Sequence, residues 1–190
     1  MNFAKKRLVV GMSGSSGAEI GIELLKVMQH FTDWETHLVI SEGARRTIEH
    51  ETKYSAAEVE ALASKVHALE NVGASIASGS FKAEGMVVVP CSMKTVAGIA
   101  NGFSHNLLLR AADVTIKERR RLVLVARETP LSSIHLRNML TLSDMGVTIM
   151  PPMLTFYNHP ETIQDMVRHI VGKITDVFGI EMSGYKRWEG

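Results

Sequence analysis

The residues whose types and spacing suit them to chemistry lie in short turns that follow apolar, strand-like runs. The first turn combines three glycines with three serines, Gly11-Met12-Ser13-Gly14-Ser15-Ser16-Gly17. Glycine lets the backbone approach a ligand closely, and backbone N–H groups together with serine hydroxyls can bind a phosphate. Ser41 follows the second run, and Cys91-Ser92-Met93-Lys94-Thr95 follows the third. One serine after a strand is often only a helix cap, but three such turns at one sheet edge favour an anion-binding site.

The glycine spacing in the first turn restricts which phosphate ligand fits. Glycines at positions 11, 14 and 17 do not form the G-x-G-x-x-G pattern, and no lysine follows the last one as a P-loop requires. A mononucleotide such as FMN therefore fits this turn better than NAD or ATP. A tight turn with a purely structural role is the alternative.

Charged residues form a second group of candidates. Arg127 and Glu128 follow the fourth strand-like run, and adjacent residues in an extended chain point to opposite faces. A surface ion pair is the alternative for these two. Arg110, Asp113 and Lys117 are spaced three and four residues apart, which places them on one face of a helix. By itself that pattern is typical of a solvated, charged helix face.

Lys173 is a less ordinary cation. It lies within or beside the apolar stripe of the last predicted helix, three residues after Ile170 and four before Val177. A cation buried there should have an anionic partner. The alternative is that only its aliphatic stem is buried and the ammonium reaches water.

The elements that position these residues alternate along the whole chain. The strand-like runs are Leu8 to Met12, Thr36 to Ile40, Met86 to Val89, Arg121 to Ala126 and Val147 to Met150. The helical patterns between them are Ala18 to Gln29, Ser55 to Ala63, Lys94 to Asn101, Asn106 to Glu118 and Leu131 to Met145, and a last helix starts at Pro160. Alternation of this kind predicts an α/β fold with a parallel sheet, and we expect one domain over residues 1–190.

Composition excludes several classes of protein. The 190 residues are 45% hydrophobic and 22% charged, which is typical of a globular protein. The net charge is only +1, so no global electrostatic field attracts nucleic acid or an acidic membrane. Cys91 is the single cysteine, which excludes a disulfide scaffold, and we expect it to be a buried packing residue. The eight histidines show no metal-ligand spacing, so we predict no metal site. Short apolar runs and the lack of a signal-like start predict a cytoplasmic protein.

The ordered motifs resemble the UbiX/Pad1 family. The resemblance runs in register from about Arg7 to Trp188 and is closest to the branch of the family that is associated with phenolic acid decarboxylases. The motifs that carry it are Val10 to Ala18, Glu35 to Ser41, Pro90 to Thr95, Arg110 to Asp113, Lys117 to Arg120, Arg127 to Leu131, Met150 to Pro152 and Phe156 to Pro160.

This resemblance implies an activity and an architecture. Members are flavin prenyltransferases, which join the dimethylallyl group of dimethylallyl monophosphate to reduced FMN at N5 and then at C6. The prenylated FMN serves a separate UbiD-type decarboxylase. The implied fold is a three-layer sandwich, Rossmann-like or flavodoxin-like, with helices on both faces of the sheet. The implied assembly is a homo-oligomer, a dodecamer, with its sites at subunit interfaces.

Roles of individual residues also follow from the resemblance. Ser16 and Glu128 would handle protons, and Lys117 would assist catalysis at the leaving phosphate. Trp188 would enclose the prenyl group. FMN would be held by Gly14, Ser15, Ser16, Ser41, Ser92, Met93, Lys94, Thr95 and Arg127. The allylic phosphate would be held, without a metal, by Arg110, Lys117, Tyr157 and Lys173.

Two other functions are alternatives to prenyl transfer. The protein could itself be an FMN-dependent aromatic acid carboxy-lyase, which would release CO2 without a partner. It could also be a non-catalytic FMN carrier. The cations expected around a second phosphate argue against the carrier.

Overall fold

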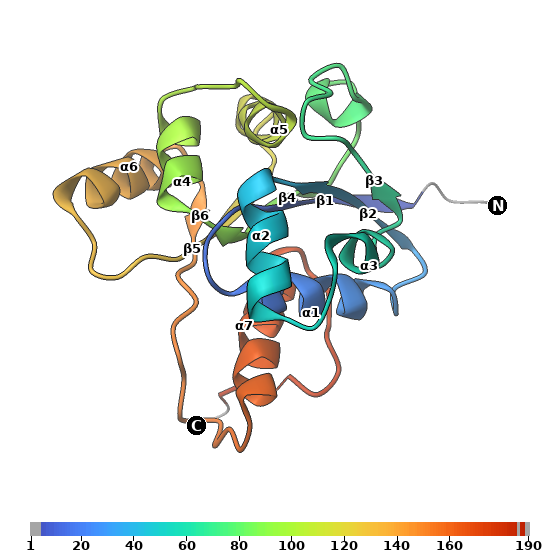
Figure 1. Ribbon diagram of the computed structural model, residues 1–190, viewed down its shortest axis with the longest axis vertical. Coiled ribbons are helices and arrows are strands. Elements are labelled where there is room, and N and C mark those ends of the chain that lie inside the picture. Colours follow the sequence, from blue (N-terminus) through green and yellow to red (C-terminus); the bar gives the residue numbers. More distant parts are fainter. Residues whose placement is uncertain (1–4, 186, 189–190) are drawn as a thin grey trace.

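Six parallel strands form one sheet in the order β3-β2-β1-β4-β5-β6 (Figure 1). The computed structural model describes residues 5–185 and 187–188. The strands are β1 (Lys6–Met12), β2 (Trp34–Ile40), β3 (Lys65–Val66), β4 (Gly85–Cys91), β5 (Arg121–Ala126) and β6 (Thr148–Ile149). The chain builds outward in one direction from β1 and in the other from β4, so a crevice opens between the carboxyl ends of these two strands. Ligands of open α/β sheets bind at such a switch point.

Helices cover both faces of the sheet, which makes the predicted three-layer sandwich (Figure 1). They are α1 (Ala18–Met28), α2 (Glu42–Glu51), α3 (Ala56–Glu60), α4 (Met93–Ala100), α5 (Leu107–Lys117), α6 (Ser133–Asp144) and α7 (Ile163–Val177), with a short 3-10 helix, η1 (Ser75–Ala77). One apolar cluster lies under α1 and α7, and a second lies under α4, α5 and α6.

The central strands are buried on both faces because successive side chains point in opposite directions. In β1, Leu8 and Val10 join the cluster under α1 and α7, whereas Val9 joins the cluster under α4 to α6. This arrangement explains why the strands read as unbroken apolar runs. The five strands expected from those runs are all present.

Three details differ from the sequence-based expectations. The two-residue strand β3 and the helix α2 were not predicted. The last helix starts at Ile163, so the predicted start at Pro160 is wrong. The reason is a capping box: the Thr162 hydroxyl accepts the N–H of Asp165, and the Asp165 carboxylate accepts the N–H of Thr162. In the described part of the chain, no helix is long and apolar enough to span a membrane.

Candidate functional site

The loops after β1 and β4 are joined by hydrogen bonds at the switch point. The buried Ser13 hydroxyl accepts the backbone N–H of Ser92 at 2.8 Å and donates to the carbonyl of Pro90 at 3.2 Å. The Ser92 hydroxyl in turn caps α4 by accepting the N–H of Thr95 at 3.4 Å. The N-terminus of α4 is therefore held next to the glycine-serine loop.

The loop after β1 also touches the N-terminus of α2. A Cβ atom on Gly14 would lie 2.8 Å from Cα of Gly43, so the two backbones approach more closely than any side chain allows. Ser41 caps α2 by accepting the N–H of Ala44 at 3.2 Å. The expected convergence of three loops at one sheet edge is what the structure shows.

This edge has the features of a phosphate cradle. The Ser15 hydroxyl oxygen is buried and, among the described residues, lacks a hydrogen-bond partner. A buried hydroxyl without a partner is costly, and a polar ligand would supply one. Met93 and Thr95 are nearly buried beside the loop, whereas Lys94 is exposed. The residues present therefore fit a phosphorylated mononucleotide such as FMN.

Glu51, at the end of α2, is a site residue that the sequence did not reveal. Its Oε2 accepts the N–H groups of Gly17 at 2.9 Å and Ala18 at 3.3 Å, at the start of α1. Burial raises its pKa, but hydrogen bonds from the Ser16 side chain and these two N–H groups, with the charge of Arg127, hold the pKa below its ordinary value. Glu51 is thus an ionised carboxylate in contact with Ser16.

Glu128 lies elsewhere. Its Oε1 accepts the N–H of the next residue, Thr129, at 3.1 Å, and the side chain is exposed. No hydrogen bond among the described residues joins Glu128 to Ser16. The carboxylate that the structure places beside Ser16 is Glu51, while Arg127 is close enough to act on Glu51.

Cys91 lies at the end of β4, between these loops, and is fully buried. Burial raises the pKa of its thiol. The neutral thiol packs in the cluster under α4 to α6. The expectation that Cys91 is a packing residue is confirmed.

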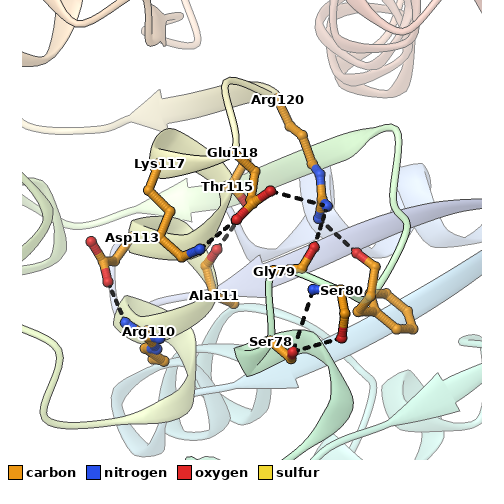
Figure 2. A network of polar contacts seen from close by, with 11 residues as sticks. Ser78, Gly79, Ser80, Arg110, Ala111, Asp113, Thr115, Lys117, Glu118 and Arg120 are labelled. Carbon is orange, nitrogen blue, oxygen red and sulfur yellow. Dashed lines mark hydrogen bonds and ion pairs between the residues drawn. The ribbon is translucent and has the colours of Figure 1, made fainter.

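Two cations predicted to hold the allylic phosphate lie on α5 (Figure 2). Arg110 Nη1 lies 2.6 Å from Asp113 Oδ2, and Lys117 Nζ contacts Glu118 Oε1. The side chains of both pairs are between 34% and 47% exposed, so both cations can reach an anion from outside the chain.

A neighbouring loop holds the Lys117 end of α5 in place (Figure 2). Arg120 donates to the carbonyls of Phe81 and Gly79, both at 2.7 Å, and lies 3.9 Å from the second oxygen of Glu118. The approach is so close that a Cβ on Gly79 would collide with the carboxylate of Glu118. Lys117 is therefore paired with the carboxylate of Glu118, and Arg120 and the loop at Gly79 fix the position of that carboxylate.

The other residues predicted at the donor site gather around α7. The Tyr157 hydroxyl lies 3.3 Å from Nε2 of His169, and the Tyr157 ring meets the Trp188 ring edge-on at 5.6 Å. Lys173, one turn beyond His169, is close enough to affect its titration. The structure thus brings Tyr157, Lys173 and Trp188 into one neighbourhood.

Lys173 lies beside the buried stripe of α7 and not within it, so the alternative in which its ammonium reaches water holds for the single chain. Its side chain is exposed, and no hydrogen bond or ion pair joins it to another described residue. Ile170 and Ile174 face the core, whereas position 173 falls just outside that stripe. The ammonium is consequently open to a ligand.

The four predicted phosphate-binding residues form two groups in one chain. Arg110 and Lys117 lie on α5, which covers one face of the sheet, and Lys173 lies on α7, which covers the other (Figure 1). No hydrogen bond or ion pair between described residues joins Arg110 or Lys117 to Tyr157 or Lys173. No cluster of His, Cys, Asp or Glu in the described residues is arranged to hold a metal ion.

A doubly wound parallel sheet with a phosphate cradle at its switch point defines a class of nucleotide-binding α/β proteins. The Flavoprotein family profile matches residues 2–175. The chain belongs to this family and, within it, to the UbiX-like flavin prenyltransferases, as its relatives show. The flavin prenyltransferase LpdB of Lactiplantibacillus plantarum is 54% identical over 185 residues, which cover 97% of this chain and 99% of that protein.

Two solved structures have nearly the same fold. A dodecameric FMN-dependent UbiX-like decarboxylase from Escherichia coli O157:H7 has a TM-score of 0.96 at 54% identity and covers 97% of this chain and 100% of its own. AnUbiX (PadA1), solved in complex with FMN and dimethylallyl pyrophosphate, has a TM-score of 0.96 at 49% identity and covers 98% of both chains.

Proposed function

We propose that this protein transfers the dimethylallyl group of dimethylallyl monophosphate to reduced FMN, forming bonds at N5 and C6. The observation that carries the proposal is a second set of partly exposed cationic side chains, Arg110, Lys117 and Lys173, apart from the switch-point cradle. A flavin carrier needs one phosphate site, whereas a transferase that uses a phosphorylated donor needs two. AnUbiX (PadA1), which was solved with FMN and dimethylallyl pyrophosphate, supports two sites in one fold.

The switch-point cradle is the proposed FMN site. Helix N-termini supply N–H groups to the phosphate, and the orphaned Ser15 hydroxyl gains a partner when a ligand binds. Arg127, near the start of α1, adds a positive charge. The proposed FMN-binding residues are Gly14, Ser15, Ser16, Ser41, Ser92, Met93, Lys94, Thr95 and Arg127.

The remaining cations stabilise the leaving group. As the allylic C–O bond breaks, negative charge develops on the phosphate, and preorganised cations and hydroxyls lower the barrier. Arg110, Lys117 and Lys173 supply the charges, and Tyr157 supplies a hydroxyl. Trp188, edge-on to Tyr157, encloses the dimethylallyl group.

Proton transfer is assigned to the end of the cradle where Ser16 meets Glu51. Forming the second bond displaces a proton from the flavin ring, and an ionised carboxylate can accept it through a serine hydroxyl. The hydrogen bond between Ser16 and Glu51 favours this path. Glu128, beside Arg127 in the chain, is a second candidate for handling protons near the phosphate.

Assembly completes the site in this proposal. Because α5 and α7 cover opposite faces of the sheet, Arg110 and Lys117 of one copy must meet Tyr157 and Lys173 of another. The dodecameric relative from Escherichia coli O157:H7 supports a homo-oligomer of the same kind. The product would pass to a UbiD-type decarboxylase in the cytoplasm.

One incubation tests the proposal. The purified protein is mixed anaerobically with reduced FMN and dimethylallyl monophosphate, and the released flavin is identified by mass spectrometry. We expect a flavin heavier by one C5 unit. Unchanged FMN from protein that binds both compounds would contradict prenyl transfer. CO2 release from an aromatic acid by the protein alone would instead support the carboxy-lyase function suggested by the name of the Escherichia coli relative.

A further inference from the structure

His169 is a buried polar residue of α7 that the proposed mechanism leaves without a role. Its exposed fraction is 5%, whereas Tyr157, whose hydroxyl it contacts, is 41% exposed. Its ring packs edge-on against Tyr157 at 5.5 Å and at a tilt against Tyr185 at 5.3 Å. His169 therefore sits behind Tyr157, on the side away from solvent.

A chain of hydrogen bonds determines which nitrogen of His169 carries the proton. The Thr155 hydroxyl donates to Oδ1 of Asn158 at 3.4 Å, which turns the amide nitrogen of Asn158 toward His169. That nitrogen lies 3.4 Å from Nδ1 of His169. An amide NH2 group only donates, so Nδ1 accepts, and the proton of the neutral ring is on Nε2.

This tautomer of His169 determines the direction of its hydrogen bond with Tyr157. Nε2–H of His169 donates to the Tyr157 oxygen at 3.3 Å, so the proton of the Tyr157 hydroxyl is not used inside the chain. In the opposite tautomer of His169, Nε2 would accept the hydroxyl proton of Tyr157, and only lone pairs of the Tyr157 oxygen would face outward. A hydroxyl that donates outward binds an anion, whereas one that only accepts repels it.

The surroundings keep the ring neutral. Burial and the nearby charge of Lys173 lower the pKa of His169 below its ordinary value. The ring contacts Tyr157, Asn158 and Tyr185, and the charge of Lys173 acts on it. The carboxylates of Glu161 and Asp165 line the same pocket as His169, and the Asp165 carboxylate accepts the N–H of Thr162 at the start of α7. A neutral His169 also leaves Lys173 as the cation of this neighbourhood.

We propose that His169 is a positioning residue, which holds Tyr157 so that its hydroxyl donates to the phosphate of the prenyl donor. Thr155 and Asn158 act through His169 by selecting its tautomer. The inference rests on the proposed function, because it assigns Tyr157 to the donor phosphate. It adds a group that never touches the donor but determines how the donor is bound.

The test measures donor binding apart from catalysis. The protein is loaded with oxidised FMN, which is not the reacting form, and the dissociation constant of dimethylallyl monophosphate is measured by calorimetry. We expect His169→Leu and Tyr157→Phe each to weaken binding about 10-fold, as the loss of one hydrogen bond to a charged group does. His169→Gln should stay within about 2-fold of the wild type, because the glutamine amide can replace the Nε2–H donor.

A double variant separates positioning from a general structural effect. If His169 acts through Tyr157, then His169→Leu should add less than about 2-fold to the loss caused by Tyr157→Phe. The control His67→Gln, which changes another buried histidine, should leave donor binding unchanged. FMN affinity, followed by flavin fluorescence, should be the same in all variants.

Other outcomes overturn the inference. It is wrong if His169→Leu binds the donor normally, if His169→Gln binds as weakly as the leucine variant, or if the two losses multiply in the double variant. Wild-type protein that binds the donor but forms no C5-flavin would contradict the proposed function alone, since the binding constants still decide the role of His169. Wild-type protein that does not bind the donor would overturn both.

Discussion

Two carboxylates are candidates to accept a proton near the flavin, and their surroundings differ. Glu51 is held at the start of α1 by two backbone N–H groups and contacts Ser16. Glu128 is exposed and accepts only the N–H of its neighbour Thr129 in the hydrogen bonds of the described chain. A base must reach the proton that it accepts, and the contact with Ser16 favours Glu51.

Replacing Glu51 should therefore slow transfer more than replacing Glu128. In Glu51→Gln the amide oxygen still accepts an N–H group, but the basicity is lost, so we expect the rate of C5-flavin formation to fall about 100-fold or more. FMN affinity should change little. The rate is measured anaerobically at saturating reduced FMN and donor.

The control for this comparison is Glu49→Gln, which changes an exposed glutamate of the same helix. It should keep the wild-type rate. A large loss in Glu128→Gln together with a normal rate in Glu51→Gln would reverse the assignment.

At the scale of elements, a pair of buried histidines joins β2 to β3 at the edge of the sheet. His37 Nδ1 lies 3.0 Å from His67 Nε2, and His37 Nε2 lies 3.6 Å from the carboxylate of Glu35. His37 donates to Glu35 and accepts from His67 when both rings are neutral. If both rings were protonated, two N–H groups would face each other, so this contact requires at least one neutral ring.

This pair predicts a loss of stability in acid. Burial, together with the charges of His37 and Lys65, lowers the pKa of His67 to about 4. An unfolded histidine titrates near about 6.5, so between pH 6.5 and 4 the unfolded chain binds more protons and the free energy of unfolding falls as the pH falls. We expect the melting temperature of the wild type to fall more between pH 7.5 and 5 than that of His67→Gln.

The control variant is His30→Gln, which changes an exposed histidine after α1. Its melting temperature should follow the wild type at both pH values. Equal pH dependence in His67→Gln and the wild type would show that the buried pair does not control acid stability.

The contact between the loop after β1 and α2 also makes a prediction. A Cβ on Gly14 would lie 2.8 Å from backbone Cα of Gly43, and backbone cannot move aside as a flexible side chain can. Gly14→Ala should therefore lower the free energy of unfolding by about 1–3 kcal/mol, the usual cost of overpacking. It should also weaken FMN binding, measured by fluorescence titration.

A matched control is Gly73→Ala, whose added Cβ would meet only the Asn71 side chain at 3.6 Å. Its stability should stay within about 0.5 kcal/mol of the wild type. If Gly14→Ala were as stable as this control and bound FMN normally, the close approach would have no role in shaping the cradle.

The same elements show what the sequence could and could not predict. Four central strands were predictable because burial on both faces leaves apolar runs such as Leu122 to Val125. Helix α2 could not be predicted, because it is mostly polar and buries only Ala44 and Ile48. Glu51 was missed with it, since it lies 34 residues from Gly17 and only folding brings them together.

At the scale of the whole molecule, the isolated chain exposes several large apolar side chains on α6 and in the segment after β6. On α6, Ile134, Leu136 and Leu140 are between 52% and 61% exposed, and Met153, Leu154 and Phe156 follow in an extended segment with 60% to 71% exposed. Exposed apolar patches of this kind mark association surfaces. Together with the division of the cations between two faces of the sheet, they fit the proposal that a neighbouring copy completes the site.

Disrupting this surface should therefore stop catalysis without unfolding the chain. In Leu136→Glu/Leu140→Glu, two carboxylates would have to be buried at an interface, whereas in a free chain they would remain in water. We expect light scattering to report a smaller assembly and circular dichroism to remain unchanged. C5-flavin formation should fall at least about 100-fold, because cations on a neighbouring copy no longer reach the donor phosphate.

Thr32→Glu, on an exposed loop after α1, is the control and should keep both mass and activity. A dissociated double variant with the wild-type rate would show that each chain holds a complete site, and a double variant of unchanged mass would show that α6 is not the association surface.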